Sequence, residues 1–96
     1  MFARLITVKI QPAKFEEFAE TFSKELLPAI SRECGFKCMY VMKDIAQDKI
    51  TVLAVWDSES GAKNSIESYL DQRLPKVANF LASQPNAETL EVVLRA

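Results

Sequence analysis

The chain has 96 residues, of which 49% are apolar and 26% are charged, the balance of a folded globular protein rather than a disordered one. Its 12 basic and 13 acidic residues leave a formal net charge of −1, which excludes a strong field for nucleic acid or an anionic membrane surface. This length predicts one domain over residues 1–96. No apolar run is long enough to predict a membrane-spanning helix.

The first predicted element is a β-strand over residues 3–10, ARLITVKI. Ile6, Val8 and Ile10 alternate with more polar neighbours, as in a strand with one buried face. Arg4 and Lys9 interrupt the apolar run and no small-residue cleavage site follows, so we do not read it as a secretory signal. We therefore expect a cytoplasmic protein.

A helix is predicted from Ala13 to about Arg32, because the apolar residues change to helical spacing. The stripe comprises Phe15, Phe18, Phe22, Leu26 and Ile30. Pro12 suits the first turn of a helix, whereas Pro28 in the last turns should kink the helix or shorten it.

Two strands are predicted next, over residues 36–43 (FKCMYVMK) and 49–56 (KITVLAVW). Gly35 provides the chain reversal before the first of them, and the polar DIAQD turn between them predicts a hairpin. Asp57 or Ser58 then caps a second helix.

The second helix is expected to run through AKNSIESYLDQRL, to bend or restart at Pro75, and to continue to Ala82. The polar SQPNAE stretch predicts a loop, and TLEVVLR at 89–95 predicts a last strand.

The order β-α-β-β-α-β predicts an α+β, ferredoxin-like fold with a four-stranded antiparallel sheet and both helices on one face. In the second strand, Phe36, Cys38, Tyr40 and Met42 are expected on one face, with other apolar residues on the opposite face. A sheet that is apolar on both faces needs a second cover. We expect that cover to be a second copy of the chain, in a homodimer joined through the sheet face.

Cys34 and Cys38 do not predict a metal or redox site. On an extended chain they lie about 13 Å apart, beyond the reach of a disulfide, and the sequence contains no histidine to complete a metal site. Cys38 is predicted to be a small core residue, and Cys34 to be partly exposed near the turn.

Three segments together resemble the antibiotic biosynthesis monooxygenase family of dimeric α+β barrel proteins: LPAISRECGF, KCMYVMKD and AVWDSESGAKNS. The resemblance is greatest to small members with no assigned activity, and it covers nearly the whole chain. It implies a ferredoxin-like protomer whose sheet packs against a partner's sheet, with a pocket between sheet and helices in each protomer.

The family includes haem-degrading enzymes and cofactor-independent oxygenases of polycyclic aromatic molecules. Haem-degrading members are similar in having a tryptophan where Trp56 stands, but they use a histidine and a strand-one asparagine. This chain has no histidine and offers Thr7 and Lys9 on strand one, so we expect no haem and no other cofactor. The quinone-forming members use an Asn, Trp, Tyr and Arg set, which Trp56, Asn64, Tyr69 and Arg73 match in chemistry but not in spacing.

The candidate ligand-binding residues are Trp56, Tyr40, Tyr69 and Asn64. Trp56 either stacks on a planar ligand or seals the core between sheet and second helix. Tyr40 is either a hydrogen-bond donor in the pocket or a packing residue, and Asn64 faces either the pocket or solvent.

Two functions remain open. The first is binding of a small apolar or aromatic molecule, with cofactor-independent monooxygenase chemistry if the chain is an enzyme. The alternative is a non-catalytic dimeric interaction or regulatory module whose pocket is filled by side chains. An internal cavity of ~300 Å³ with converging polar groups would favour the first, and a closely packed interior would favour the second.

Overall fold

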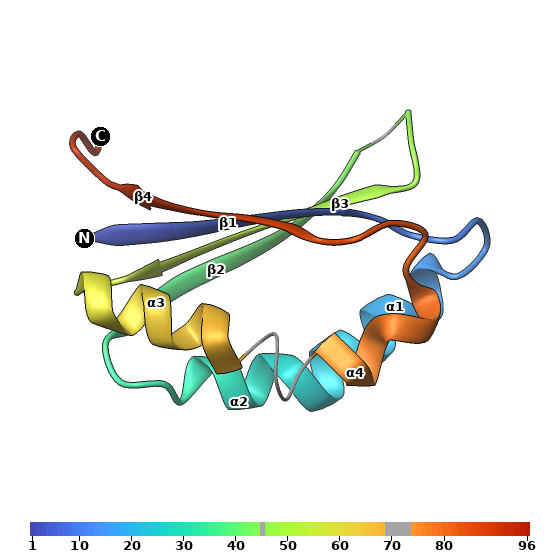
Figure 1. Ribbon diagram of the computed structural model, residues 1–96, viewed down its shortest axis with the longest axis horizontal. Coiled ribbons are helices and arrows are strands. Elements are labelled where there is room, and N and C mark those ends of the chain that lie inside the picture. Colours follow the sequence, from blue (N-terminus) through green and yellow to red (C-terminus); the bar gives the residue numbers. More distant parts are fainter. Residues whose placement is uncertain (45, 69–73) are drawn as a thin grey trace.

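The structure, a computed structural model, describes residues 1–44, 46–68 and 74–96; for residues 66–68 it describes the backbone alone. Within these residues, four strands form one antiparallel sheet in the order β2-β3-β1-β4, and the helices cover one of its faces (Figure 1). The strands are β1 (Phe2–Lys9), β2 (Phe36–Lys43), β3 (Lys49–Trp56) and β4 (Asn86–Glu91). The helical segments are α1 (Phe15–Thr21), η1 (Phe22–Leu26), α2 (Leu27–Ser31), α3 (Glu59–Ser68), α4 (Leu74–Val77) and η3 (Ala78–Phe80). The ferredoxin-like α+β fold is therefore confirmed.

The first helix consists of α1, the π-helical segment η1 and α2, which follow one another without a gap. At its end the Leu27 N–H donates to the carbonyl of Phe22, five residues back. Pro28 follows directly and has no N–H for the carbonyl of Lys24, which would be its partner in a regular α-helix. The predicted disturbance at Pro28 thus takes the form of a wider turn in front of the proline rather than an end to the helix.

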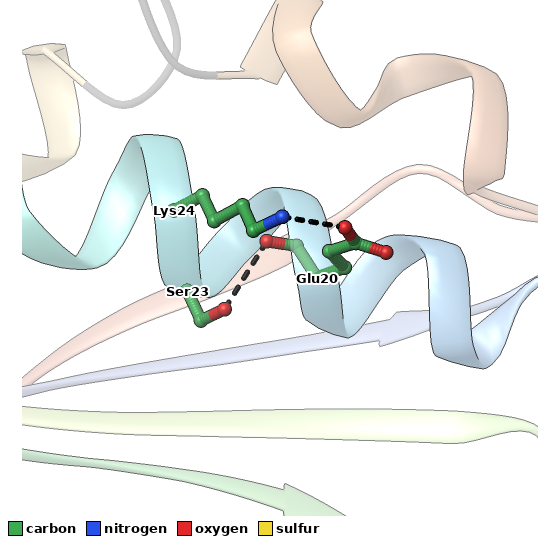
Figure 2. Close-up of polar contacts among 3 residues, drawn as sticks. All are labelled: Glu20, Ser23 and Lys24. Atoms are coloured by element: carbon green, nitrogen blue, oxygen red, sulfur yellow. Dashed lines mark hydrogen bonds and ion pairs between the residues drawn. The ribbon is translucent and has the colours of Figure 1, made fainter.

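The exposed side of this helix carries short-range polar contacts. Lys24 Nζ lies 2.7 Å from Glu20 Oε1, and Ser23 Oγ donates to the Glu20 carbonyl (Figure 2). The hydrogen bond and positive charge of Lys24 lower the pKa of Glu20, and the same contact raises the pKa of Lys24. These contacts lie on the solvent side and leave the opposite, apolar stripe to face the sheet.

The core lies between the helices and the inner face of the sheet. Ile6, Val52 and Ala54 of the central strands are at most 5% exposed. Residues from the helices complete the same cluster, including Phe18, Phe22, Leu26, Ile30, Ala62 and Val77. Each of these side chains removes apolar surface from water, which is the main driving force for folding.

A β-bulge at the start of β2 changes one predicted face. Phe36 is paired with Trp56, but Cys38 is paired with Val55, so Lys37 is an extra residue in the ladder. Phe36 therefore lies on the inner face with Trp56, while Cys38 and the two following alternate residues lie on the outer face. The expectation that Phe36 shares a face with Cys38, Tyr40 and Met42 was wrong, because a bulge adds one residue to the period of two.

The last strand begins earlier than predicted. β4 spans Asn86–Glu91, and its register with β1 pairs Thr7 with Asn86 and Phe2 with Glu91. Val92 N–H still donates to the Met1 carbonyl, but residues 93–96 belong to no strand. Residues 86–88, which include the polar Asn86 and Glu88, pair because β1 offers them an unpaired edge, a tertiary effect that local composition does not reveal.

Candidate functional site

An arginine is buried between the sheet and the helices. Arg4 points from β1 to the inner face and is 1% exposed. Its Nη1 donates a 2.7 Å hydrogen bond to Ser65 Oγ on α3, and Ser65 Oγ in turn lies 3.3 Å from Oε1 of Glu33. Burying a guanidinium costs several kcal/mol unless hydrogen bonds and opposite charge compensate it, so this chain of contacts ties three parts of the fold together.

Trp56 lies against this arginine at the end of β3. Its indole ring is 0% exposed, and the Arg4 guanidinium carbon lies 5.0 Å from the ring centroid, within cation–π range. Phe36 packs edge-on to the same indole at 5.8 Å. The buried Trp56 Nε1 finds no hydrogen-bond acceptor in the described part of the chain, an uncommon state for a buried donor.

The close approach of α3 to Trp56 depends on Gly61. A Cβ added there would lie 3.2 Å from Trp56 Cδ1 and 3.2 Å from Ser58 Oγ. Of the two predicted caps, Asp57 and Ser58, it is Ser58 that caps the helix, because its Oγ accepts the Gly61 N–H at 3.1 Å. The helix start therefore packs directly on the indole edge.

The cavity between the sheet and the helices is very small. Its volume is about 10 Å³, close to the minimum that holds one water molecule. One cationic side chain and seven apolar ones line it: Arg4, Ile6, Val8, Phe18, Phe22, Ile30, Val52 and Val77. This volume is far below that of a typical ligand pocket.

A much larger hollow lies on the outer face of the sheet. We call it the outer groove; its volume is about 860 Å³ and it is open to solvent. The residues that line it are Met1, Ala3, Lys37, Cys38, Leu53, Val55, Val92 and Arg95. The groove thus has an apolar floor from β1 and β3 and two cationic side chains at its rim.

The structure does not bring the predicted binding residues together. Trp56 is buried on the inner face, whereas Tyr40 lies on the outer face of β2 and is 61% exposed. Asn64 is exposed on α3. Tyr69 and Arg73 lie outside the described residues. Among the described members of the set, Trp56 alone lies beside the sheet–helix cavity, through its contact with the cavity-lining Arg4.

Sequence reasoning missed Arg4 and Ser65. In the sequence Arg4 interrupts an apolar run, yet its place in the alternation with Ile6 and Val8 puts it on the inner face. The alternation along the strand was the signal that could have indicated the burial of Arg4, but it conflicts with the usual exposure of arginine side chains.

Both cysteines are free and exposed. For Cys34 this agrees with the prediction, but for Cys38 the predicted core position was wrong, because the bulge leaves it on the outer face. The described residues contain no group of three or more potential metal ligands. They also include no helix long and apolar enough to cross a membrane.

Solved structures with the same fold include proteins of bacterial and archaeal origin. A candidate antibiotic biosynthesis monooxygenase from Nitrosomonas europaea is 15% identical, with a TM-score of 0.81 over 98% of this chain and 100% of that one. A protein of unknown function from the same organism is 20% identical, with a TM-score of 0.81 over 99% of this chain and 91% of that one. A conserved protein from Methanosarcina mazei Go1 is 20% identical, with a TM-score of 0.76 over 93% and 90% of the two chains.

At these identities the likeness shows the fold alone. The comparison with curated proteins found no match. The family model for antibiotic biosynthesis monooxygenases matches residues 1–71, which include β1, the first helix, the hairpin and α3 with the Arg4–Ser65 contact. The chain therefore belongs to the antibiotic biosynthesis monooxygenase family.

Proposed function

We propose that this protein acts as a homodimer joined through the outer faces of the two sheets. The observation that carries the proposal is the exposure of large apolar side chains on that face: Tyr40 is 61%, Leu90 47% and Met42 42% exposed. Together with the groove floor they form an apolar surface of a kind that monomeric proteins rarely expose. A second copy is the simplest cover, since a twofold axis places each such patch on its own counterpart.

Within this dimer we propose a role as an interaction or regulatory module rather than as an enzyme. Phe18 and Phe22 project into the space that a ligand would occupy, and the remaining cavity of about 10 Å³ holds at most one water molecule. Arg4 and Trp56 then serve the packing of sheet, α3 and the turn before β2. The exposed free thiols of Cys34 and Cys38 suit a reducing compartment such as the cytoplasm.

A second function is favoured by one specific observation. The buried Trp56 Nε1 has no acceptor among the described residues, and its neighbour Arg4 lines an otherwise apolar cavity. A small apolar or aromatic molecule with one acceptor group would satisfy the indole N–H if the core opened to admit it. A cofactor-independent oxygenase could use such a site, because a dry cavity favours reaction of a deprotonated substrate with oxygen.

One experiment separates these functions. Native mass spectrometry of freshly purified protein gives the assembly state and reveals any co-purified small molecule. The proposal expects a dimer at twice the chain mass with nothing bound. A dimer that carries a small molecule would support the second function, and binding that quenches Trp56 fluorescence would place the molecule in the core. A monomer would contradict both.

A further inference from the structure

The π-helical segment η1 lies between residues that line the cavity of the sheet and the helices. Phe18 precedes the segment, Phe22 is its first residue and Ile30 follows it, and all three line this cavity of about 10 Å³. Wide π-helical turns are rare in proteins, and they are frequent at functional sites. Here the wide turn sets the direction in which the cavity-lining side chains point.

The wide turn brings the apolar stripe of the helix into line. Phe18, Phe22, Leu26 and Ile30 follow one another at intervals of four residues, and each is at most 6% exposed. In a regular α-helix each residue turns by about 100°, so one interval of four overshoots a full turn by about 40° and three overshoot by about 120°. A π turn takes up one additional residue, which reduces the total mismatch to about 20°. The burial of all four side chains thus depends on the wide turn.

Pro28 fixes the wide turn at its present place. The Leu27 N–H donates to the carbonyl of Phe22, five residues back. A regular α-helical turn at this point would press the Pro28 ring against the carbonyl of Lys24, four residues back. If the wide turn moved toward the N-terminus, residues 22–28 would become regular α-helix and this clash would arise. The proline therefore opposes the movement.

Movement of the wide turn by one helical turn would exchange one side chain in the core. Residues 19–22 would rotate by about 100° about the helix axis, whereas Phe18 before them and Leu26 after them would keep their directions. Phe22 would leave the cavity, and Ser23, which is exposed in the structure, would point where Phe22 points now. A hydroxymethyl group would thus replace a phenyl ring, and the cavity would grow by nearly the volume of that ring.

We propose that this wide turn is the gate of the sheet–helix cavity, and that its movement toward the N-terminus turns Phe22 out and Ser23 in. The proposal rests on the second proposed function for what enters, a small apolar or aromatic molecule with an acceptor group. The Ser23 hydroxyl then donates a hydrogen bond to that group. Because Pro28 keeps the closed arrangement dominant, the molecule binds by shifting the population toward the open one.

The first test measures the rate of thiol labelling at single positions of the helix. Both native cysteines are replaced by serine, and Phe22→Cys, Phe18→Cys and Leu26→Cys are made one at a time. A buried thiol reacts only in the fraction of molecules that expose it. Adding Pro28→Ala removes the clash of the open arrangement and should accelerate labelling at position 22 about tenfold or more. Positions 18 and 26 are the matched controls, and their labelling should not change.

Two results of this test would overturn the inference. Equal acceleration at all three positions would mean that Pro28→Ala loosens the whole helix instead of moving the wide turn. An unchanged rate at position 22 would mean that the wide turn does not move.

The second test leaves the core side chains in place. The chain is labelled with fluorophenylalanine, and fluorine NMR in H₂O and D₂O identifies exposed rings by their solvent isotope shift. In Pro28→Ala we expect a second Phe22 signal with the shift of an exposed ring. The Phe18 ring lies 5.8 Å from the Phe22 ring and should show no isotope shift, because it stays in the core. A Phe22 ring that remains protected in Pro28→Ala would contradict the gate.

The outcomes also separate the gate from the proposed functions. If position 22 responds to Pro28→Ala but the protein binds no small molecule, the gate stands and the second function fails. If a small molecule binds in the core but position 22 does not respond, the second function stands and the gate is refuted. The assembly state does not affect either test, since the helices lie on the face of the sheet opposite the proposed dimer contact (Figure 1).

Discussion

Arg4 Nη1 on β1 donates a 2.7 Å hydrogen bond to Ser65 Oγ on α3, and both side chains are buried. The contact joins an inner strand of the sheet to the helix that covers it. A hydrogen bond to a charged group is worth about 1.5–3 kcal/mol, and a buried donor left without its acceptor costs a comparable amount. The Arg4–Ser65 contact is therefore a sensitive point in the stability of the fold.

We predict that Ser65→Ala lowers the free energy of unfolding by about 1–3 kcal/mol, because it removes the acceptor of Arg4 Nη1. Urea denaturation followed by Trp56 fluorescence measures this change. Ser23→Ala is the matched control, since Ser23 makes its hydrogen bond on the exposed side of the first helix. Equal stability of Ser65→Ala and the unaltered chain would show that the contact contributes nothing.

A second prediction concerns Gly35, the turn residue before β2. Its φ is +82°, and an added Cβ would overlap the carboxylate of Asp57. The Gly35 carbonyl also accepts the Asp57 N–H at 2.9 Å, so the backbones of the two residues are held close together.

Gly35→Ala should therefore destabilise the protein by about 1–3 kcal/mol, from the left-handed backbone and from the displaced carboxylate. Chemical denaturation measures the loss. In the double variant Gly35→Ala with Asp57→Ala, the part due to the carboxylate should be recovered and the backbone part should remain. Full recovery would show that the positive φ costs nothing at this site.

Ala13 allows the opposite prediction. It has a φ of +67°, and Lys14 N–H donates to the Gln11 carbonyl at 3.0 Å, with Pro12 between them. This is the pattern of a type II turn, whose third position favours glycine. Ala13→Gly should stabilise the fold by about 0.5 kcal/mol, because the left-handed strain it relieves exceeds the entropy that glycine loses on folding. A thermal melt that shows a lower midpoint for Ala13→Gly would contradict this reading of the turn.

The contact between Lys24 and Glu20 predicts a pH dependence. Since Lys24 lowers the pKa of Glu20, the contact adds stability above the ordinary carboxyl pKa, and this is lost as the pH falls through the lowered pKa of the folded state. Since Glu20 raises the pKa of Lys24, the contribution persists through neutral pH and is lost as the pH rises through the raised lysine pKa.

Lys24→Gln should return the pKa of Glu20 toward its ordinary value, as measured by NMR titration of the Glu20 carboxyl carbon. Lys63→Gln serves as the control, because Lys63 pairs with Glu59 on α3 instead. Both residues of the Glu20–Lys24 pair are exposed, so the change in stability should be small. An unchanged Glu20 pKa in Lys24→Gln would mean that the pair does not form in solution.

The sequence predicted the hairpin best. The bounds of β2 and β3 agree with the residues expected, because apolar residues make up most of both strands and a polar turn separates them. It did not predict which way Phe36 points, since a bulge depends on how one strand pairs with its neighbour rather than on its own composition. The early start of β4 likewise depends on pairing with a neighbouring strand, here β1, rather than on the composition of β4 itself.

The candidate site was harder to predict than the fold. Trp56 and Tyr40 were both predicted as ligand-binding residues of one pocket, but their side chains lie on opposite faces of the sheet. The burial of Arg4 was not predicted, because the free energy of burying it depends on Ser65, 61 residues away in sequence. Contacts between such distant residues cannot be read from local pattern.

In the proposed dimer, a second copy of the chain covers the outer face of the sheet. Equilibrium sedimentation of the unaltered chain over a wide concentration range tests this most directly. We predict a single species at twice the chain mass that dissociates only at the lowest concentrations. A mass equal to one chain at every concentration would contradict the dimer, and the outer face with Leu53 and Val55 would then be in contact with water.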